Sequence, residues 1–150
     1  MALTMAAVMR GIGDAAAELT PGPDKREACC IFVRRALELA GMRVDDASIT
    51  LWYLWPSEGD PWGPVTAAVR CGAAPASTLV PMGAYVVQGW RDKPFGKSGH
   101  CLFVVQWGGA EAYYYDSAAK RPGNGDGAHI DPLSWLDEEF PGGWKAAKVA

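Results

Sequence analysis

The chain has 150 residues, of which 49% are hydrophobic and 21% charged, and its formal net charge at pH 7 is -3. These values predict one soluble globular domain over residues 1–150, large enough to bury a core without disulfides. A chain without a basic excess is not expected to bind nucleic acid.

The N-terminal part of the chain predicts two helices. Apolar residues at helical spacing predict the first over residues 3–19, and the sequence TPGPD ends it. Asp24, with Glu27 three residues later, has the spacing of a capping box and predicts a second helix that ends at Ala40. Gly41 is a typical helix terminator.

The rest of the chain predicts an antiparallel sheet. Residues 42–82 are rich in Trp, Pro and Gly and predict loops with one short helix at PVTAAVRCG. Strand patterns follow in AYVVQGW, HCLFVVQW and EAYYYD, and two glycines between the last two are typical of a hairpin. A loop containing GNGDG then leads to a short helix over residues 132–139. Helices followed by antiparallel strands indicate an α+β fold with N-terminal helices packed on a central sheet.

The second predicted helix opens with two adjacent cysteines. On a helical wheel, Val33 and Ala36 fall within about 40° of Cys29, so Cys29 is the cysteine expected to face the sheet. A thiol in the first turn lies near the positive end of the helix dipole, which lowers its pKa. These features favour Cys29 as a nucleophile; the alternative is that Cys29 and Cys30 are both structural core residues.

His100 and Asp116 are the candidate partners of this thiol. His100 begins a strand that is apolar on both faces, and a cysteine at a helix start can meet a histidine at the end of a facing strand. Asp116 can orient the imidazole only if the hairpin register places both side chains on one face. A loop of Gly108 and Gly109 alone places Asp116 on the opposite face, whereas a loop that includes Ala110 places it diagonal to His100. We favour the second register.

Three segments carry a family resemblance over residues 24–117. CCIFVRRALELAG resembles the cysteine helix of the NlpC/P60 and CHAP peptidoglycan peptidases, SGHCLFVV resembles their Gly-His-Val strand, and PMGAYVVQGW is similar to the strand before it. Some type VI secretion amidase effectors share this plan. Aligned on Phe32, the resemblance assigns the nucleophile to Cys29. It implies a papain-like, NlpC/P60-type fold and a cysteine hydrolase of bacterial peptidoglycan, either a stem-peptide endopeptidase or an N-acetylmuramoyl-L-alanine amidase, with no cofactor or metal.

Two alternatives arise from departures from the family pattern. The small residues that follow the family's nucleophile are replaced by Cys30 and Ile31, and the Asp that often precedes it is Ala28. Because Ile31 can crowd the substrate, one alternative is an inactive papain-like module that binds the cell wall or a protein. The other is a Cys-His amidase or deamidase acting on a protein substrate.

A zinc site is the disfavoured reading of the same residue types. It would use two cysteines and a histidine together with Cys101, but neighbours on a strand point to opposite faces. His100 and Cys101 are such neighbours, so they could not readily bind the same metal ion. The four residues of this site would be Cys29, Cys71, His100 and Cys101.

Aromatic residues of the middle segment are expected to line a groove for the stem peptide and its sugar. The alternative for each is a core or loop anchor. The four assigned to substrate binding are Trp52, Trp55, Trp62 and Trp90.

The N-terminal segment lacks the features of a signal peptide, because Arg10 and Asp14 interrupt its apolar residues. We therefore expect synthesis in the cytoplasm, no membrane span, and action on the cell wall after delivery by another system. A phage lysin, a phage tail component and an injected effector are the alternatives. The partner would be a phage protein or, for an effector, a cognate immunity protein.

Overall fold

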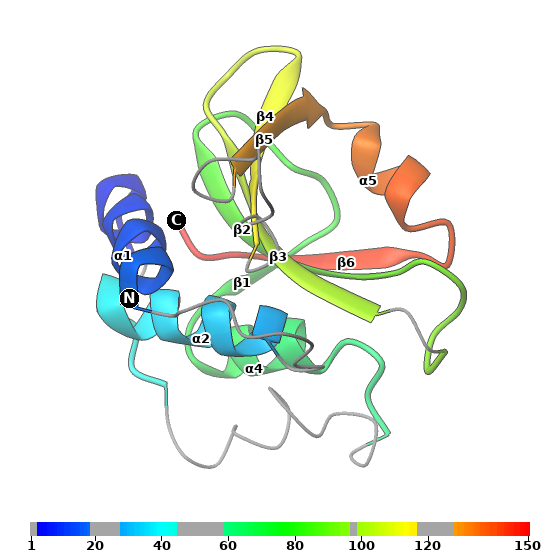
Figure 1. Cartoon of the computed structure of the whole chain (residues 1–150), viewed down its shortest axis with the longest axis horizontal. Coiled ribbons are helices and arrows are strands. Elements are labelled where there is room, and N and C mark those ends of the chain that lie inside the picture. Colours follow the sequence, from blue (N-terminus) through cyan, green and yellow to red (C-terminus); the bar gives the residue numbers. More distant parts are fainter. Residues whose placement is uncertain (1–2, 19–27, 45–58, 97–98, 117–127) are drawn as a thin grey trace.

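The structure is a computed structural model that describes residues 3–18, 28–44, 59–96, 99–116 and 128–150 (Figure 1). These ranges form an α+β fold, as expected. The helices are α1 (Met5–Glu18), α2 (Ala28–Ala40), α4 (Gly63–Arg70) and α5 (Trp135–Glu139). The strands are β1 (Ala74–Ala76), β2 (Gly83–Trp90), β3 (Gly99–Gln106), β4 (Glu111–Tyr115), β5 (Ala128–Pro132) and β6 (Trp144–Lys148).

The strands form one antiparallel sheet in the order β1-β6-β2-β3-β4-β5. Alternate side chains of β3 fill two cores, with Phe103 in the core beneath α1, α2 and α4, and Leu102 in the core beneath α5. Figure 1 shows the sheet between these helices, with α5 apart from the other three. Strands β2 and β3 are buried on both faces because both sides of the central sheet are covered.

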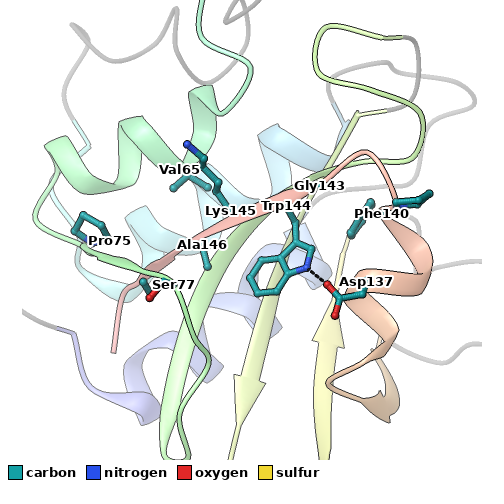
Figure 2. A pocket seen from close by; sticks show the side chains of 11 residues that line it. Val65, Pro75, Ser77, Asp137, Phe140, Gly143, Trp144, Lys145 and Ala146 are labelled. Atoms are coloured by element: carbon teal, nitrogen blue, oxygen red, sulfur yellow. Dashed lines mark hydrogen bonds between the residues drawn. The ribbon is translucent and has the colours of Figure 1, made fainter.

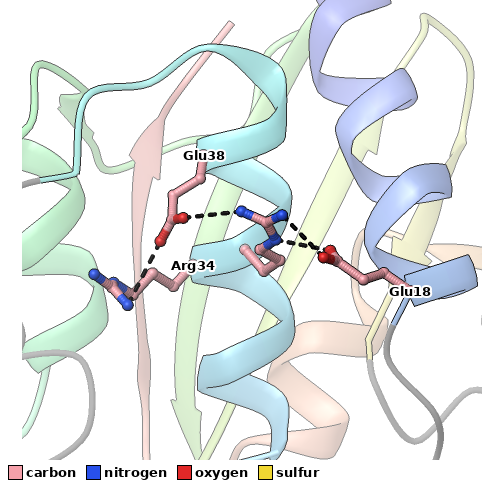
Figure 3. Close-up of polar contacts among 4 residues, drawn as sticks. Glu18, Arg34 and Glu38 are labelled. Carbon is pink, nitrogen blue, oxygen red and sulfur yellow. Dashed lines mark hydrogen bonds and ion pairs between the residues drawn. The ribbon is translucent and has the colours of Figure 1, made fainter.

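Helices α1 and α2 pack closely against each other. Gly11 lies against the backbone of α2, where an added Cβ would be 2.2 Å from the carbonyl oxygen of Ala36. At the surface, the Arg35 guanidinium donates two hydrogen bonds to the Glu18 carboxylate, at 2.7 and 2.9 Å, and contacts Glu38 (Figure 3). Helix α2 ends as predicted at Gly41, whose φ of 104° suits glycine. Asp24 and Glu27, the predicted cap, lie outside the described residues.

The β3–β4 hairpin has the register that we favoured. Val105 pairs with Tyr113 and Phe103 with Tyr115, so the same register pairs Leu102 with Asp116. Strand β4 starts at Glu111, and Ala110 belongs to the loop. Asp116 therefore follows the strand on the face that carries His100.

Strands β1, β5 and β6 were not predicted from the sequence. Strand β6, with the sequence WKAAK, lies between β1 and β2 and is therefore an interior strand of the sheet. Its Ala and Lys residues favour helix over strand, so packing against β2 rather than intrinsic propensity determines its conformation. Within the described ranges, no helix is both long and apolar enough to cross a membrane.

Candidate active site

His100 and Asp116 form the polar centre of the candidate site. His100 is the second residue of β3 and Asp116 directly follows β4. The hairpin register brings them together, with 2.7 Å between Nε2 of His100 and Oδ2 of Asp116. The two side chains are 11% and 16% exposed, so solvent screens the pair only weakly.

Cys29 approaches the same imidazole from the helix layer. It is the second residue of α2 and is half-buried, and its thiol lies close enough to the side chain of His100 for each group to shift the pKa of the other. Since Nε2 of His100 is bound to Asp116, the ring nitrogen left for the thiol is Nδ1. The three side chains thus form a continuous contact chain in the order Cys29, His100, Asp116.

Phe140 covers the imidazole from the other layer. Its ring centroid is 6.4 Å from that of His100, with an interplanar angle of 35°. Gly89, which pairs with His100 across the sheet, leaves room for this ring, because a Cβ there would be 2.3 Å from a carbon of Phe140. The imidazole therefore lies at the end of the sheet, between the helix layer and α5.

The protonation of His100 results from opposing effects. Burial disfavours the charged imidazolium, but the hydrogen bond that it donates to the Asp116 carboxylate, together with its interaction with Cys29, outweighs burial. Together these effects raise the pKa of His100 to about 9. At neutral pH the imidazole is therefore protonated and can donate to Asp116.

The thiol of Cys29 is held in its neutral form, contrary to our expectation from the helix dipole. A hydrogen bond with Cys30, burial, and the proximity of the Cys30 sulfur raise the pKa of Cys29 well above its ordinary value. His100 lowers it but does not compensate. The neighbouring Cys30 sulfur therefore outweighs the effect of the helix dipole on this thiol.

Three thiols meet at this point of the structure. The sulfur of Cys30 is 3.9 Å from that of Cys29, and Cys30 also hydrogen-bonds Cys101 on β3. Cys30 and Cys101 are 5% and 0% exposed. Cys30 is therefore the core cysteine of the pair, and our expectation that Cys29 faces the sheet more directly was wrong, although Val33 is fully buried as the wheel predicts.

The predicted tryptophan groove is confirmed for none of its four residues. Trp90 is 1% exposed and donates from Nε1 to the carbonyl oxygen of Pro61, at 2.9 Å, so it anchors the core and does not line a groove. Trp62 is half-buried at the start of α4, with Nζ of Lys145 5.3 Å from its ring centroid. Trp52 and Trp55 lie outside the described residues.

A groove that the sequence did not reveal lies beside the site (Figure 2). It has a volume of about 870 Å³ and is open to solvent. Its wall includes Trp144, whose Nε1 donates to Oδ1 of Asp137 at 2.9 Å, and Lys145. The groove does not contain the Cys29–His100–Asp116 chain, and Phe140 is the side chain shared by the two.

The described residues contain no group of three or more His, Cys, Asp or Glu side chains that could hold a metal ion. The zinc reading therefore has no support within those ranges. What the arrangement offers is a thiol, a protonatable imidazole and a carboxylate in sequence, which is the set required for nucleophilic attack on a carbonyl carbon.

Comparisons with protein-family models, with curated proteins and with solved structures gave no significant match to this chain.

Proposed function

We propose that the protein is a cysteine hydrolase that cleaves an amide bond of bacterial peptidoglycan, on a papain-like fold. The observation that carries the proposal is the contact chain from the Cys29 thiol through His100 to the Asp116 carboxylate. Helix α2 supplies the thiol, and β3 and β4 supply its partners, the order expected from the resemblance to NlpC/P60 and CHAP peptidases.

The proposed reaction starts with loss of one proton from the Cys29–His100 pair. The resulting thiolate attacks the carbonyl carbon, and the backbone N–H of Cys29, in the first turn of α2, donates to the developing oxyanion. His100 then protonates the leaving amine. Water hydrolyses the acyl-enzyme, and Asp116 keeps the imidazole oriented in both steps.

The groove beside Phe140 fits the proposed substrate class. A stem peptide carries amide, carboxylate and amine groups, and the groove wall offers Lys145 and Asp137 beside the Trp144 ring. Phe140 lines the groove and also lies beside the imidazole of His100. One end of a substrate bound in the groove would therefore be near the imidazole. The N-terminal end of α2, which carries Cys29, would make the remaining contacts with the substrate.

Access to peptidoglycan requires delivery to the cell wall. We propose that this occurs by a phage or secretion route, with a phage protein or a cognate immunity protein as the partner. The inactive binding module remains the competing function, and its specific support is the neutral Cys29 thiol together with Ile31 beside it.

Digestion of purified peptidoglycan, followed by mass spectrometry of the fragments, tests the proposal. The native chain should release fragments with one amide hydrolysed, and the bond cut distinguishes endopeptidase from amidase. Cys29→Ala should abolish release, and Asp116→Asn should reduce the rate by about 100-fold or more. Cys71→Ala, at the end of α4, is the matched cysteine control and should retain full activity. Intact peptidoglycan after incubation with the folded native chain at neutral and alkaline pH would favour the binding module.

A further inference from the structure

The three clustered thiols differ in their access to solvent. Cys29, Cys30 and Cys101 are all reduced, but only Cys29 is partly exposed. Its sulfur lies 3.9 Å from that of Cys30, which is close to van der Waals contact. A small oxidant can therefore reach Cys29 before the two buried thiols, and Cys30 is placed to reduce the product.

We propose that Cys29 and Cys30 form a reversible oxidation site, at which a peroxide converts the two thiols into a disulfide and so blocks the nucleophile. The proposal rests on the proposed function only for its effect on activity. The oxidation itself requires the sulfur geometry alone.

The two steps balance in atoms and electrons. The Cys29 thiolate attacks one peroxide oxygen, the O–O bond breaks, and the products are Cys29 sulfenic acid and hydroxide, or an alkoxide from an organic peroxide. The Cys30 thiol loses its proton and attacks the Cys29 sulfur. The S–O bond breaks, the departing oxygen leaves as water, and an S–S bond forms. Two external thiols reverse the reaction by exchange.

The position of the pair makes this disulfide easy to reduce. Adjacent Cα atoms are about 3.8 Å apart across a trans peptide, which is shorter than the usual Cα separation of disulfide partners. The bond is therefore strained, and strained disulfides are the labile and regulatory ones. The pair lies in the first turn of α2, where backbone N–H groups have no acceptor among the described helical residues, so distortion there costs fewer hydrogen bonds than in the middle of the helix.

Cys101 is the competing partner, and burial argues against it. Cys101 is fully buried on β3, and the thiol that interacts with it by hydrogen bonding is Cys30. Cys30, by contrast, already lies 3.9 Å from the Cys29 sulfur, in the same turn of α2. Cys30 therefore captures the sulfenic acid first.

Hydrogen peroxide treatment of the whole chain at alkaline pH, in a Cys71→Ala background, tests the proposal by intact mass and peptide mapping. The Cys71→Ala protein should become about 2 Da lighter, with the link mapped to Cys29 and Cys30, and dithiothreitol should reverse the change. Adding Cys30→Ala should instead give an increase of about 32 or 48 Da at Cys29 that dithiothreitol does not reverse. Cys30→Ser provides the same comparison if the alanine variant does not fold. Adding Cys101→Ala should leave the link unchanged.

A link that maps to Cys101, or sulfinic acid at Cys29 in the protein that keeps Cys30, would overturn the proposal. Hydrolysis of peptidoglycan is measured in parallel. If the reduced protein does not hydrolyse peptidoglycan, the proposed function fails, while the mass result still decides the oxidation site. If the reduced protein does hydrolyse peptidoglycan, this activity should disappear with oxidation and return with dithiothreitol only when Cys30 is present.

Discussion

At the scale of single residues, Cys30 has the largest effect on the chemistry of Cys29. Its hydrogen bond is the main cause that raises the pKa of the Cys29 thiol, ahead of burial. With the pKa of His100 also raised, to about 9, the pair holds both protons at neutral pH. The reactive form, which has lost one of them, increases as pH rises toward 9, so the rates of hydrolysis and of thiol alkylation should rise from pH 7 to 9.

Replacing Cys30 with Ala should shift this dependence to lower pH. The substitution removes the hydrogen bond that favours the neutral thiol, whereas the contact with His100 is kept. The measurement is the rate of iodoacetamide modification of Cys29 against pH, followed by mass spectrometry. Cys71→Ala is the control with an unchanged profile. The same midpoint in Cys30→Ala and the native chain would show that Cys30 does not set the protonation of Cys29.

Sequence reasoning predicted the contact between His100 and Asp116 because strand register is set by alternation and loop length. It ranked Cys29 above Cys30 on the buried face, and this was wrong because residues one step apart on a helix border the same packed face, where small shifts in helix rotation decide which is covered. Trp90 was assigned to a groove for a similar reason. Its burial depends on Pro61 and the start of α4, which no local pattern reports.

At the scale of elements, the α1–α2 interface depends on a glycine. A Cβ at Gly11 would be 2.2 Å from the Ala36 carbonyl oxygen, which belongs to helix backbone and cannot move independently. Gly11→Ala should therefore reduce the free energy of unfolding by about 1–3 kcal/mol. Gly13, two residues later in α1, has no atom within 4 Å of an added Cβ, so Gly13→Ala should increase it by about 0.5–1 kcal/mol.

Urea unfolding of the two variants and the native chain measures this difference. Because both substitutions raise helix propensity equally, the contrast isolates the contact with α2. Equal stabilisation by both would mean that α1 is not packed closely on α2 at Gly11.

Helices α1 and α2 and strands β2 and β3 were predictable because their patterns are long, and the two-glycine turn after β3 indicated β4 as its hairpin partner. Strands β1, β5 and β6 are three to five residues long, and a short run carries too little periodicity to identify it. Their conformation comes from pairing with neighbours that are distant in sequence, as β6 does between β1 and β2. The groove beside Phe140 was missed with them, since β1 and β6 contribute to its wall.

At the scale of the whole molecule, the site makes stability depend on pH. The pKa of His100 is raised from 6.5 to about 9 in the folded state, so the folded protein binds the proton more tightly than the unfolded chain. The stabilisation is fully present below pH 6.5 and is lost as pH rises through 9, by about 3 kcal/mol at most. The raised pKa of Cys29 acts in the same direction at higher pH.

Urea unfolding between pH 6.5 and about 8 should therefore show a falling free energy of unfolding for the native chain. His100→Asn removes the titrating group and should give a flatter dependence over this range. A native chain whose stability rises with pH, or a variant with the same slope, would contradict the environment assigned to His100 between Asp116, Cys29 and Phe140.

The central claim is that the Cys29 sulfur attacks an amide carbonyl with the help of His100. Its most direct measurement is mass spectrometry of the enzyme quenched in acid during turnover of peptidoglycan fragments. We predict an acyl adduct that maps to Cys29 and is absent in Cys29→Ala. Continued release of hydrolysed fragments with the adduct on Cys30, or from Cys29→Ala itself, would contradict the account.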